Sequence, residues 1–351
     1  MSENPEKGSK NYYLDLGILE LDSGNISLAI EALERAVEDD PLNAAAFSNL
    51  GIAYELSRNF TKAREAYERA VELNPKNAAT LNNLAGVTQR LGNRSTAALL
   101  YESAIASDPL YIEPYQNIAR MFMEINAFTM AEPYIRKILE IEPDNAEALN
   151  LLGVITSVTE RSEEAIVHFQ EAIRHDTGQA IFLSNLGAAL RNTGDLKRAI
   201  LAFEKAAEIS PNHLSTLNNL GVLYRETGNP DKAEYYLQRV TQLYPESPFP
   251  FFNLAEIALE RDDFETALRY LKRYVALVPL DLDALFKTCG IARMADRLED
   301  AAEEMRSFLR ESEPEDPRRS TVEQWLGMQQ SQTGAKEKVK SAKEIIQKGD
   351  R

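Results

Sequence analysis

Several classes of residue and segment are scarce in this 351-residue sequence. It contains one cysteine, Cys289, so an internal disulfide cannot form. No apolar run approaches the roughly 20 residues that span a bilayer, and residues 1–10 are polar, without the apolar core of a secretory signal. These absences predict a cytoplasmic protein with no segment inserted directly in a membrane.

Cations are also in deficit. The 39 Lys and Arg residues face 55 Asp and Glu residues, which gives a formal net charge of -16. Nucleic acids and anionic membrane surfaces are bound through clustered positive charge. Neither is therefore expected to be a main partner, and we predict no nucleic-acid binding.

Residue patterns typical of catalysis are few. The sequence has three histidines and no Gly-rich phosphate loop, nucleophile elbow or Cys/His dyad. Glu164, His168, Glu171 and His175 do form one helical stripe that could ligate a metal, but a closed metal site normally draws ligands from a second element. We expect no enzyme activity, no cofactor and no metal, and keep a metal protein or enzyme using this stripe as a minor alternative.

What the sequence does contain is a repeat of 34 residues, present nine times without a shift in register. Twelve residues after a small residue in each unit comes an alanine, from Ala29 in the first unit to Ala301 in the last. The small residues are Gly17, Gly51, Ala85, Ala119, Gly153, Gly187, Gly221, Ala255 and Cys289. A constant period of this length predicts stacked repeats instead of two or three globular domains.

Each unit is predicted to form two amphipathic helices joined by a turn. Glycines mark four of these turns, at Gly24, Gly92, Gly194 and Gly228, because glycine readily adopts the left-handed conformation that ends a helix. We expect the small residue of the first helix to face the alanine of the second, so that the two backbones approach closely. A bulky residue such as Tyr67, four positions after that alanine, would fill the gap to the next unit.

The repeat resembles the tetratricopeptide repeat family over roughly residues 10–315. The second and seventh units match its signature best, through Phe47, Leu50, Gly51, Tyr54, Ala63, Tyr67, Ala70 and Pro75, and through Leu217, Leu220, Gly221, Tyr224, Ala233 and Pro245. Departures lie in the fifth unit, where Thr177 replaces proline, and in the ninth, where Thr288 and Cys289 replace Leu-Gly. The resemblance implies an all-α, right-handed α-α superhelical solenoid of tandem helix-turn-helix repeats.

The expected organisation follows the period. A polar segment covers residues 1–9, and nine units begin near residues 10, 44, 78, 112, 146, 180, 214, 248 and 282. Residues 318–330 are predicted to form a closing helix whose apolar stripe contains Val322, Trp325 and Leu326, because a terminal repeat needs a cap. Residues 334–351 are mildly basic and expected to be flexible, with a contact arm as the alternative.

A row of asparagines recurs just before the Leu of the Leu-Gly pair, at Asn49, Asn83, Asn117, Asn185, Asn219 and Asn253. Core packing does not require asparagine there, and asparagine is a poor helix former. The resemblance extends to the superhelical domain of O-linked N-acetylglucosamine transferases, and implies that these side chains face an inner groove and hold a peptide backbone. The alternative is that they bond neighbouring helices and only stiffen the array.

Two further groups of residues lie at positions that, as the resemblance implies, face the groove. Phe249, Phe252 and Phe286 either form an aromatic subsite for a ligand side chain or pack beneath the ninth unit. Arg191 and Arg225 could pair with carboxylates of a ligand, although glutamates at similar positions favour a face of mixed charge.

Together these features predict a non-catalytic scaffold or adaptor that binds an extended peptide or a partner protein in its groove. The main alternative is a structural protein that assembles into homo-oligomers through the groove or the ends of the solenoid. The identity of a partner is not encoded in a pattern of this kind.

Overall fold

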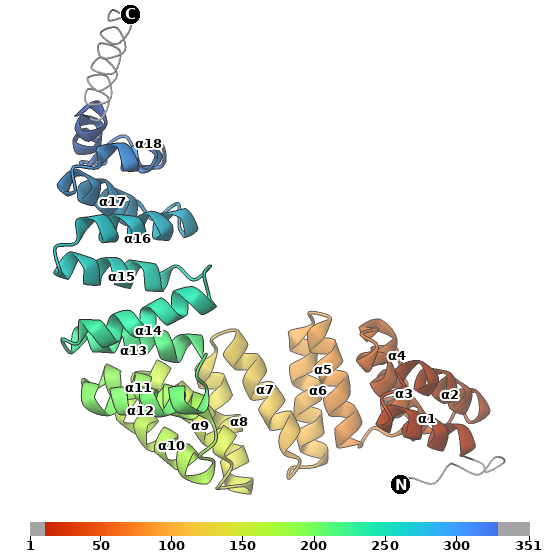
Figure 1. Ribbon diagram of the computed structural model, residues 1–351. Coiled ribbons are helices and arrows are strands. Elements are labelled where there is room, and N and C mark those ends of the chain that lie inside the picture. Colours follow the sequence, from red (N-terminus) through yellow and green to blue (C-terminus); the bar gives the residue numbers. More distant parts are fainter. Residues whose placement is uncertain (1–10, 329–351) are drawn as a thin grey trace, which may run out of the picture. The chain divides into compact units, whose positions relative to one another are not determined.

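The computed structural model describes residues 11–328 (Figure 1), which form an all-α solenoid of helix-turn-helix repeats without a strand. The polar segment 1–9, the end of the predicted closing helix and the tail 334–351 lie outside the described residues. Contacts between residues divide the chain into two compact units, residues 1–177 and 178–351, and each is described by itself.

The first compact unit contains five helix pairs. In chain order they are α1 (Tyr12–Asp22) and α2 (Ile26–Asp39), α3 (Ala44–Leu56) and α4 (Phe60–Leu73), α5 (Ala78–Arg90) and α6 (Arg94–Ser107), α7 (Ile112–Glu124) and α8 (Phe128–Ile141), and α9 (Ala146–Val158) and α10 (Ser162–His175).

The second compact unit contains four pairs. They are α11 (Ala180–Asn192) and α12 (Leu196–Ile209), α13 (Leu214–Glu226) and α14 (Pro230–Leu243), α15 (Phe249–Glu260) and α16 (Phe264–Leu277), and α17 (Leu282–Met294) with η1 (Leu298–Ala301) and α18 (Ala302–Glu311). The ninth pair therefore departs from the others, because its second helix begins with a 3-10 turn.

Successive first helices contact each other within each compact unit. These contacts join α1 to α3, α3 to α5 and α5 to α7 in the first, and α11 to α13 and α13 to α15 in the second. The first helices thus share a face, and the residues they expose there lie close enough to act together. The longest described helices have 14 residues, and none could cross a membrane.

The glycines at the small position of the first helices pack against the bulky residue of their own unit. A Cβ added at Gly51 would lie 2.5 Å from a ring carbon of Tyr67 in the same unit. Gly153 and Gly187 are covered in the same way by the rings of Phe169 and Phe203, at 2.6 and 2.7 Å. Each of these glycines therefore makes room for the bulky side chain of its own unit.

The turn within each pair uses the left-handed conformation in all nine units. Glycine provides it at the four predicted positions, with φ between 76° and 90°. The other five turns place a non-glycine residue at φ between 54° and 62°, at Arg58, Asn126, Glu160, Asp262 and Asp296. Since a left-handed L-residue costs roughly 1–2 kcal/mol, the surrounding helix packing must hold these turns in shape.

A further helix closes the array. Residues 319–328 are helical, Val322 is fully buried in the core around Cys289, and the Trp325 ring stacks on Phe286 at 5.6 Å between centroids. The described part of the predicted closing helix thus covers the end of the ninth unit. Burial raises the pKa of the Cys289 thiol to about 12, so this thiol stays protonated.

Candidate functional site

All six asparagines of the predicted row lie on first helices and are half-buried. Three of them bond to their own helix. The Nδ2 atoms of Asn49, Asn219 and Asn253 donate to the backbone carbonyl four residues earlier, at 2.9, 2.9 and 3.0 Å. This bond fixes the orientation of each carboxamide and leaves further donor and acceptor capacity on the side chain.

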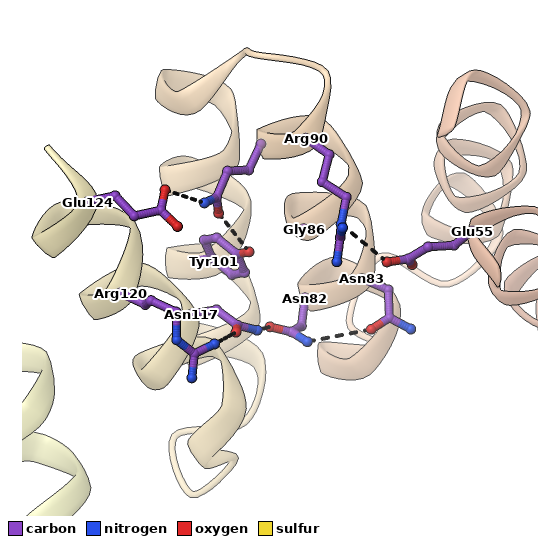
Figure 2. Close-up of a pocket in the computed structure, with 10 residues that line it drawn as sticks. Glu55, Asn82, Asn83, Gly86, Arg90, Tyr101, Asn117, Arg120 and Glu124 are labelled. Atoms are coloured by element: carbon purple, nitrogen blue, oxygen red, sulfur yellow. Dashed lines mark hydrogen bonds and ion pairs between the residues drawn. The ribbon is translucent and has the colours of Figure 1, made fainter. Parts of the chain in front are cut away.

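Asn83 and Asn117 take part in a different arrangement, which links two neighbouring helices (Figure 2). The Nδ2 atom of Asn117 on α7 donates to Oδ1 of Asn82 on α5 at 3.0 Å, and Asn82 in turn donates to Oδ1 of Asn83 at 3.5 Å. Arg120 begins this chain by donating to Oδ1 of Asn117 at 3.5 Å. The carboxamides therefore run in a connected line across α7 and α5.

These carboxamides line a pocket of ≈ 380 Å³ on the face shared by first helices α3, α5 and α7. Figure 2 shows its side chains converging from these helices, with the Tyr101 ring of α6 behind them. Its lining residues are Glu55, Asn82, Asn83, Gly86, Gln89, Arg90, Tyr101, Asn117, Arg120 and Glu124. A concave site with convergent polar groups is the usual form of a ligand site.

The back of the pocket is held rigidly. Tyr101 is 2% exposed, and its hydroxyl donates to Oε1 of Gln89 at 3.2 Å. Gln89 then donates through Nε2 to Glu124 at 3.3 Å, so both ends of its carboxamide are fixed. Burial raises the pKa of the Tyr101 phenol to about 12, which keeps this donor protonated at neutral pH. Gly86 presents no side chain to the pocket, and an added Cβ would lie 3.6 Å from the Tyr101 hydroxyl.

The predicted Arg residues lie in the second compact unit and are occupied by intramolecular pairs. Arg191 on α11 bonds Glu226 on α13 at 2.5 Å, and Arg225 on α13 bonds Glu260 on α15 at 3.0 Å. Arg225 also donates to Oδ1 of Asn253 at 3.1 Å. The first-helix face of α11, α13 and α15 is therefore a mixed-charge surface in which cations face carboxylates of the next repeat.

The three phenylalanines do not share one environment. Phe252 packs against Tyr274 at 5.2 Å between centroids, and Phe286 packs against Phe308 and Trp325. Both are half-buried against the core of the last two repeats. Phe249 is 66% exposed and is the one ring of the three that is mainly open to solvent.

Sequence reasoning missed three residues that shape the pocket: Asn82, Gly86 and Gln89. Asn82 is 7% exposed and occupies the centre of the carboxamide line. The doubled asparagine at 82–83 marks the position, but the same pair occurs at 218–219 in α13, so it does not single out this pocket. Gln89 carried no such signal, since its role depends on the phenol of Tyr101 in another helix.

The metal-ligand stripe of α10 shows no sign of a metal site. Among the described residues, no group of three or more His, Cys, Asp or Glu side chains is placed to hold an ion. Burial and the nearby Arg136 lower the pKa of His168, while Glu171 lies 4.0 Å from His175 and also pairs with Arg174.

Comparison with known proteins places the chain in a family. Tetratricopeptide repeat models match residues 14–78, 112–145, 178–246 and 252–317, which together cover most of the chain. A search of the curated proteins finds no match. Repeats of this family commonly mediate protein interactions and are generally non-catalytic scaffolds.

Several solved structures have a similar fold at low sequence identity. The C-terminal part of a repeat-containing protein from Cytophaga hutchinsonii has a TM-score of 0.57 at 16% identity, covering 68% of this chain and 98% of that one. A tetratricopeptide repeat protein from Parabacteroides merdae has a TM-score of 0.53 at 19% identity, covering 72% and 99%. Pseudomonas aeruginosa pilF has a TM-score of 0.53 at 20% identity, covering 61% and 97%. By its family matches and its helical repeats, the chain belongs to the tetratricopeptide repeat family.

Proposed function

We propose that this protein is a non-catalytic adaptor that binds an extended segment of a partner protein across the first-helix face of α3, α5 and α7. The observation that supports the proposal is the pocket of ≈ 380 Å³ lined by the carboxamides of Asn82, Asn83, Gln89 and Asn117. A carboxamide offers a donor and an acceptor, as a peptide group does, so a row of them can bond a backbone without reading its sequence.

The spacing of the helices suits an extended ligand. Packed helices lie about 8–10 Å apart, and an extended peptide advances about 3.3 Å per residue. Successive rungs on α3, α5 and α7 would therefore meet about every third residue of the ligand. Asn49, Asn83 and Asn117 supply these rungs, and the pocket lies between the last two.

The expected affinity is moderate. Each hydrogen bond contributes about 0.5–1.5 kcal/mol net, and ordering the peptide offsets part of the sum. A dissociation constant on the order of micromolar follows. Such an affinity suits an adaptor that exchanges partners.

The test is selection of short peptides from a displayed random library on the full-length protein, followed by fluorescence polarisation with the enriched peptides. The variant Asn83→Ala with Asn117→Ala removes two rungs at the pocket. Its matched control is Asn219→Ala with Asn253→Ala, which removes the corresponding rungs four repeats later. Circular dichroism would verify that both double variants keep the helicity of the wild type.

We expect the first double variant to weaken peptide binding about tenfold or more, from the loss of two or three hydrogen bonds. The control should change the affinity about twofold or less, because Asn219 and Asn253 lie outside the pocket and Arg225 already donates to Oδ1 of Asn253. Enriched peptides that bind both variants as tightly as the wild type would contradict the proposal.

A further inference from the structure

The charges around the pocket are balanced and engaged within the protein. Two carboxylates, Glu55 and Glu124, face two guanidinium groups, Arg90 and Arg120, so the lining has no net formal charge. Arg90 lies 3.7 Å from Glu55, Glu124 accepts from Gln89, and Arg120 lies 3.6 Å from a glutamate of α9, Glu147. Arg90 and Arg120 thus each lie within 4 Å of a carboxylate, whereas Glu124 is held by a neutral amide.

The polar capacity of the pocket is mostly neutral amide. Each carboxamide has two N–H hydrogens and an oxygen with two lone pairs. The line from Asn117 through Asn82 to Asn83 uses one hydrogen and one lone pair at each junction. The same carboxamides line the pocket together with the Cβ-free Gly86.

We infer that this pocket selects a peptide side chain that ends in a carboxamide, glutamine or asparagine, and holds it over Gly86 between Asn82, Asn117 and Gln89. The inference rests on the proposed peptide-binding function and names the ligand group that occupies its pocket. A carboxamide matches the wall because it donates and accepts at once. A neutral carboxamide can form these hydrogen bonds without an opposite charge in the pocket.

Other side chains fit less well for physical reasons. An ammonium or a carboxylate would lose its hydration in a pocket whose four charged groups sum to zero, and burial of an uncompensated charge is unfavourable. An apolar side chain would cover the carboxamides without bonding them, and sites built to form hydrogen bonds reject ligands that lack them. Discrimination by the pocket is therefore expected against both classes.

The first test uses single capped residues, N-acetyl and methylamide derivatives of glutamine, glutamate, lysine and methionine, titrated into the full-length protein. Side-chain amide resonances of Asn82, Asn83 and Asn117 report binding by nuclear magnetic resonance. We expect the glutamine derivative to bind about tenfold more tightly than the other three, as one or two hydrogen bonds would give. Equal or tighter binding of any of the other three, or no shift with glutamine, would overturn the inference.

The second test removes the preference for glutamine over lysine. Asn83→Asp keeps the oxygen that accepts from Asn82 and adds a negative charge to the wall. We expect the ratio of glutamine to lysine affinity to fall about tenfold in this variant. The matched control, Asn219→Asp in α13, should leave the ratio unchanged. If Asn83→Asp fails to fold, Asn117→Asp places the same charge on the opposite wall.

The outcomes separate this inference from the proposed function. Selected library peptides that depend on Asn83 and Asn117, yet show no glutamine or asparagine preference, would overturn only the carboxamide reading. If the capped glutamine binds but the library yields no binding peptide, the proposed extended-peptide function would be wrong and the carboxamide pocket would stand.

Discussion

The same five residues, Thr-Leu-Asn-Asn-Leu, occur in α5 at positions 80–84 and in α13 at positions 216–220. In α5 they border a pocket, and Asn83 accepts from Asn82. In α13 the equivalent Asn219 donates to the carbonyl of Ser215. Identical local sequence therefore leads to different hydrogen bonding, so the cause must lie in neighbouring residues.

Three neighbours account for the difference. Gly86 of α5 corresponds to Val222 of α13, so a side chain occupies the place that is open in α5. Gln89 corresponds to Arg225, which reaches Glu260 and Asn253 on α15. The third difference lies behind the helix.

Tyr101 of α6 corresponds to Leu237 of α14. The phenol of Tyr101 holds Gln89 in place, whereas Leu237 has no hydrogen-bonding group to offer Arg225. Both side chains are buried, so the core accepts either one. A repeat protein can thus keep one packing scheme while single positions decide whether a repeat exposes amides or ion pairs.

The largest expected effect is a difference in stability between alanine substitutions at Gly221 of α13 and at Gly86 of α5. In Gly221→Ala the new methyl group would lie 2.5 Å from the buried Leu237 Cγ, and we expect a loss of about 1–3 kcal/mol from overpacking. In Gly86→Ala the methyl group meets only the Tyr101 hydroxyl at 3.6 Å, so helix propensity should stabilise the protein by about 0.5–1 kcal/mol. Urea unfolding followed by circular dichroism measures both, and equal effects of the two substitutions would refute this difference in packing.

The phenol behind the pocket gives the next effect. Tyr101 has a folded pKa of about 12 against an ordinary value of 10.0. Its stabilisation is full below pH 10.0 and is lost as pH rises toward 12, because the unfolded chain releases the proton first. As pH rises through this range, the Tyr101→Phe variant should therefore lose less stability than the wild type, and the difference should be up to about 1.4 kcal/mol per pH unit. Unfolding at a series of alkaline pH values tests it; parallel curves for both proteins would contradict it.

Filling the open space beside Gly86 should make α5 resemble α13 and weaken peptide binding. Gly86→Val places in α5 the residue type that α13 has at Val222, and we expect peptide affinity to fall about tenfold while the helix remains folded. Fluorescence polarisation with a selected peptide measures this. The control Val222→Ala should leave affinity unchanged, and unchanged binding by Gly86→Val would show that the pocket is not the site.

Much of the fold could be predicted from the sequence because the period repeats the same physical constraint nine times. The helix pairs, the row of asparagines on first helices and the four glycine turns all follow from it. The five non-glycine turns occupy the same position of the 34-residue period as the glycines, so the period predicts turns there, whereas the residue types of Arg58 and Glu160 do not indicate a left-handed conformation.

The candidate site was predicted less completely. The row located Asn83 and Asn117, but the pocket depends on contacts between helices, such as the phenol of Tyr101 on Gln89. The same limit applies to Phe252 and Phe286: their spacing is compatible with a groove, yet their rings pack against Tyr274 and Trp325. Periodicity places a residue on a face, whereas its partner depends on the identity of residues in the next repeat.

The smallest expected effect comes from substitution of Arg225 in α13. This substitution tests whether charge or side-chain volume distinguishes α13 from α5. Arg225→Gln removes a partly exposed ion pair with Glu260, so stability should fall by less than about 1 kcal/mol, and by less still at high ionic strength. The substitution also releases Oδ1 of Asn253.

Peptide binding should change about twofold or less in Arg225→Gln, because Val222 still fills the space that is open at Gly86. Unfolding at two ionic strengths and fluorescence polarisation measure the two quantities. Combining Arg225→Gln with Val222→Gly should then add affinity for a carboxamide ligand that neither change gives alone. A gain in affinity from Arg225→Gln alone would mean that the ion pair of Arg225, and not the side chain of Val222, prevents α13 from binding the ligand.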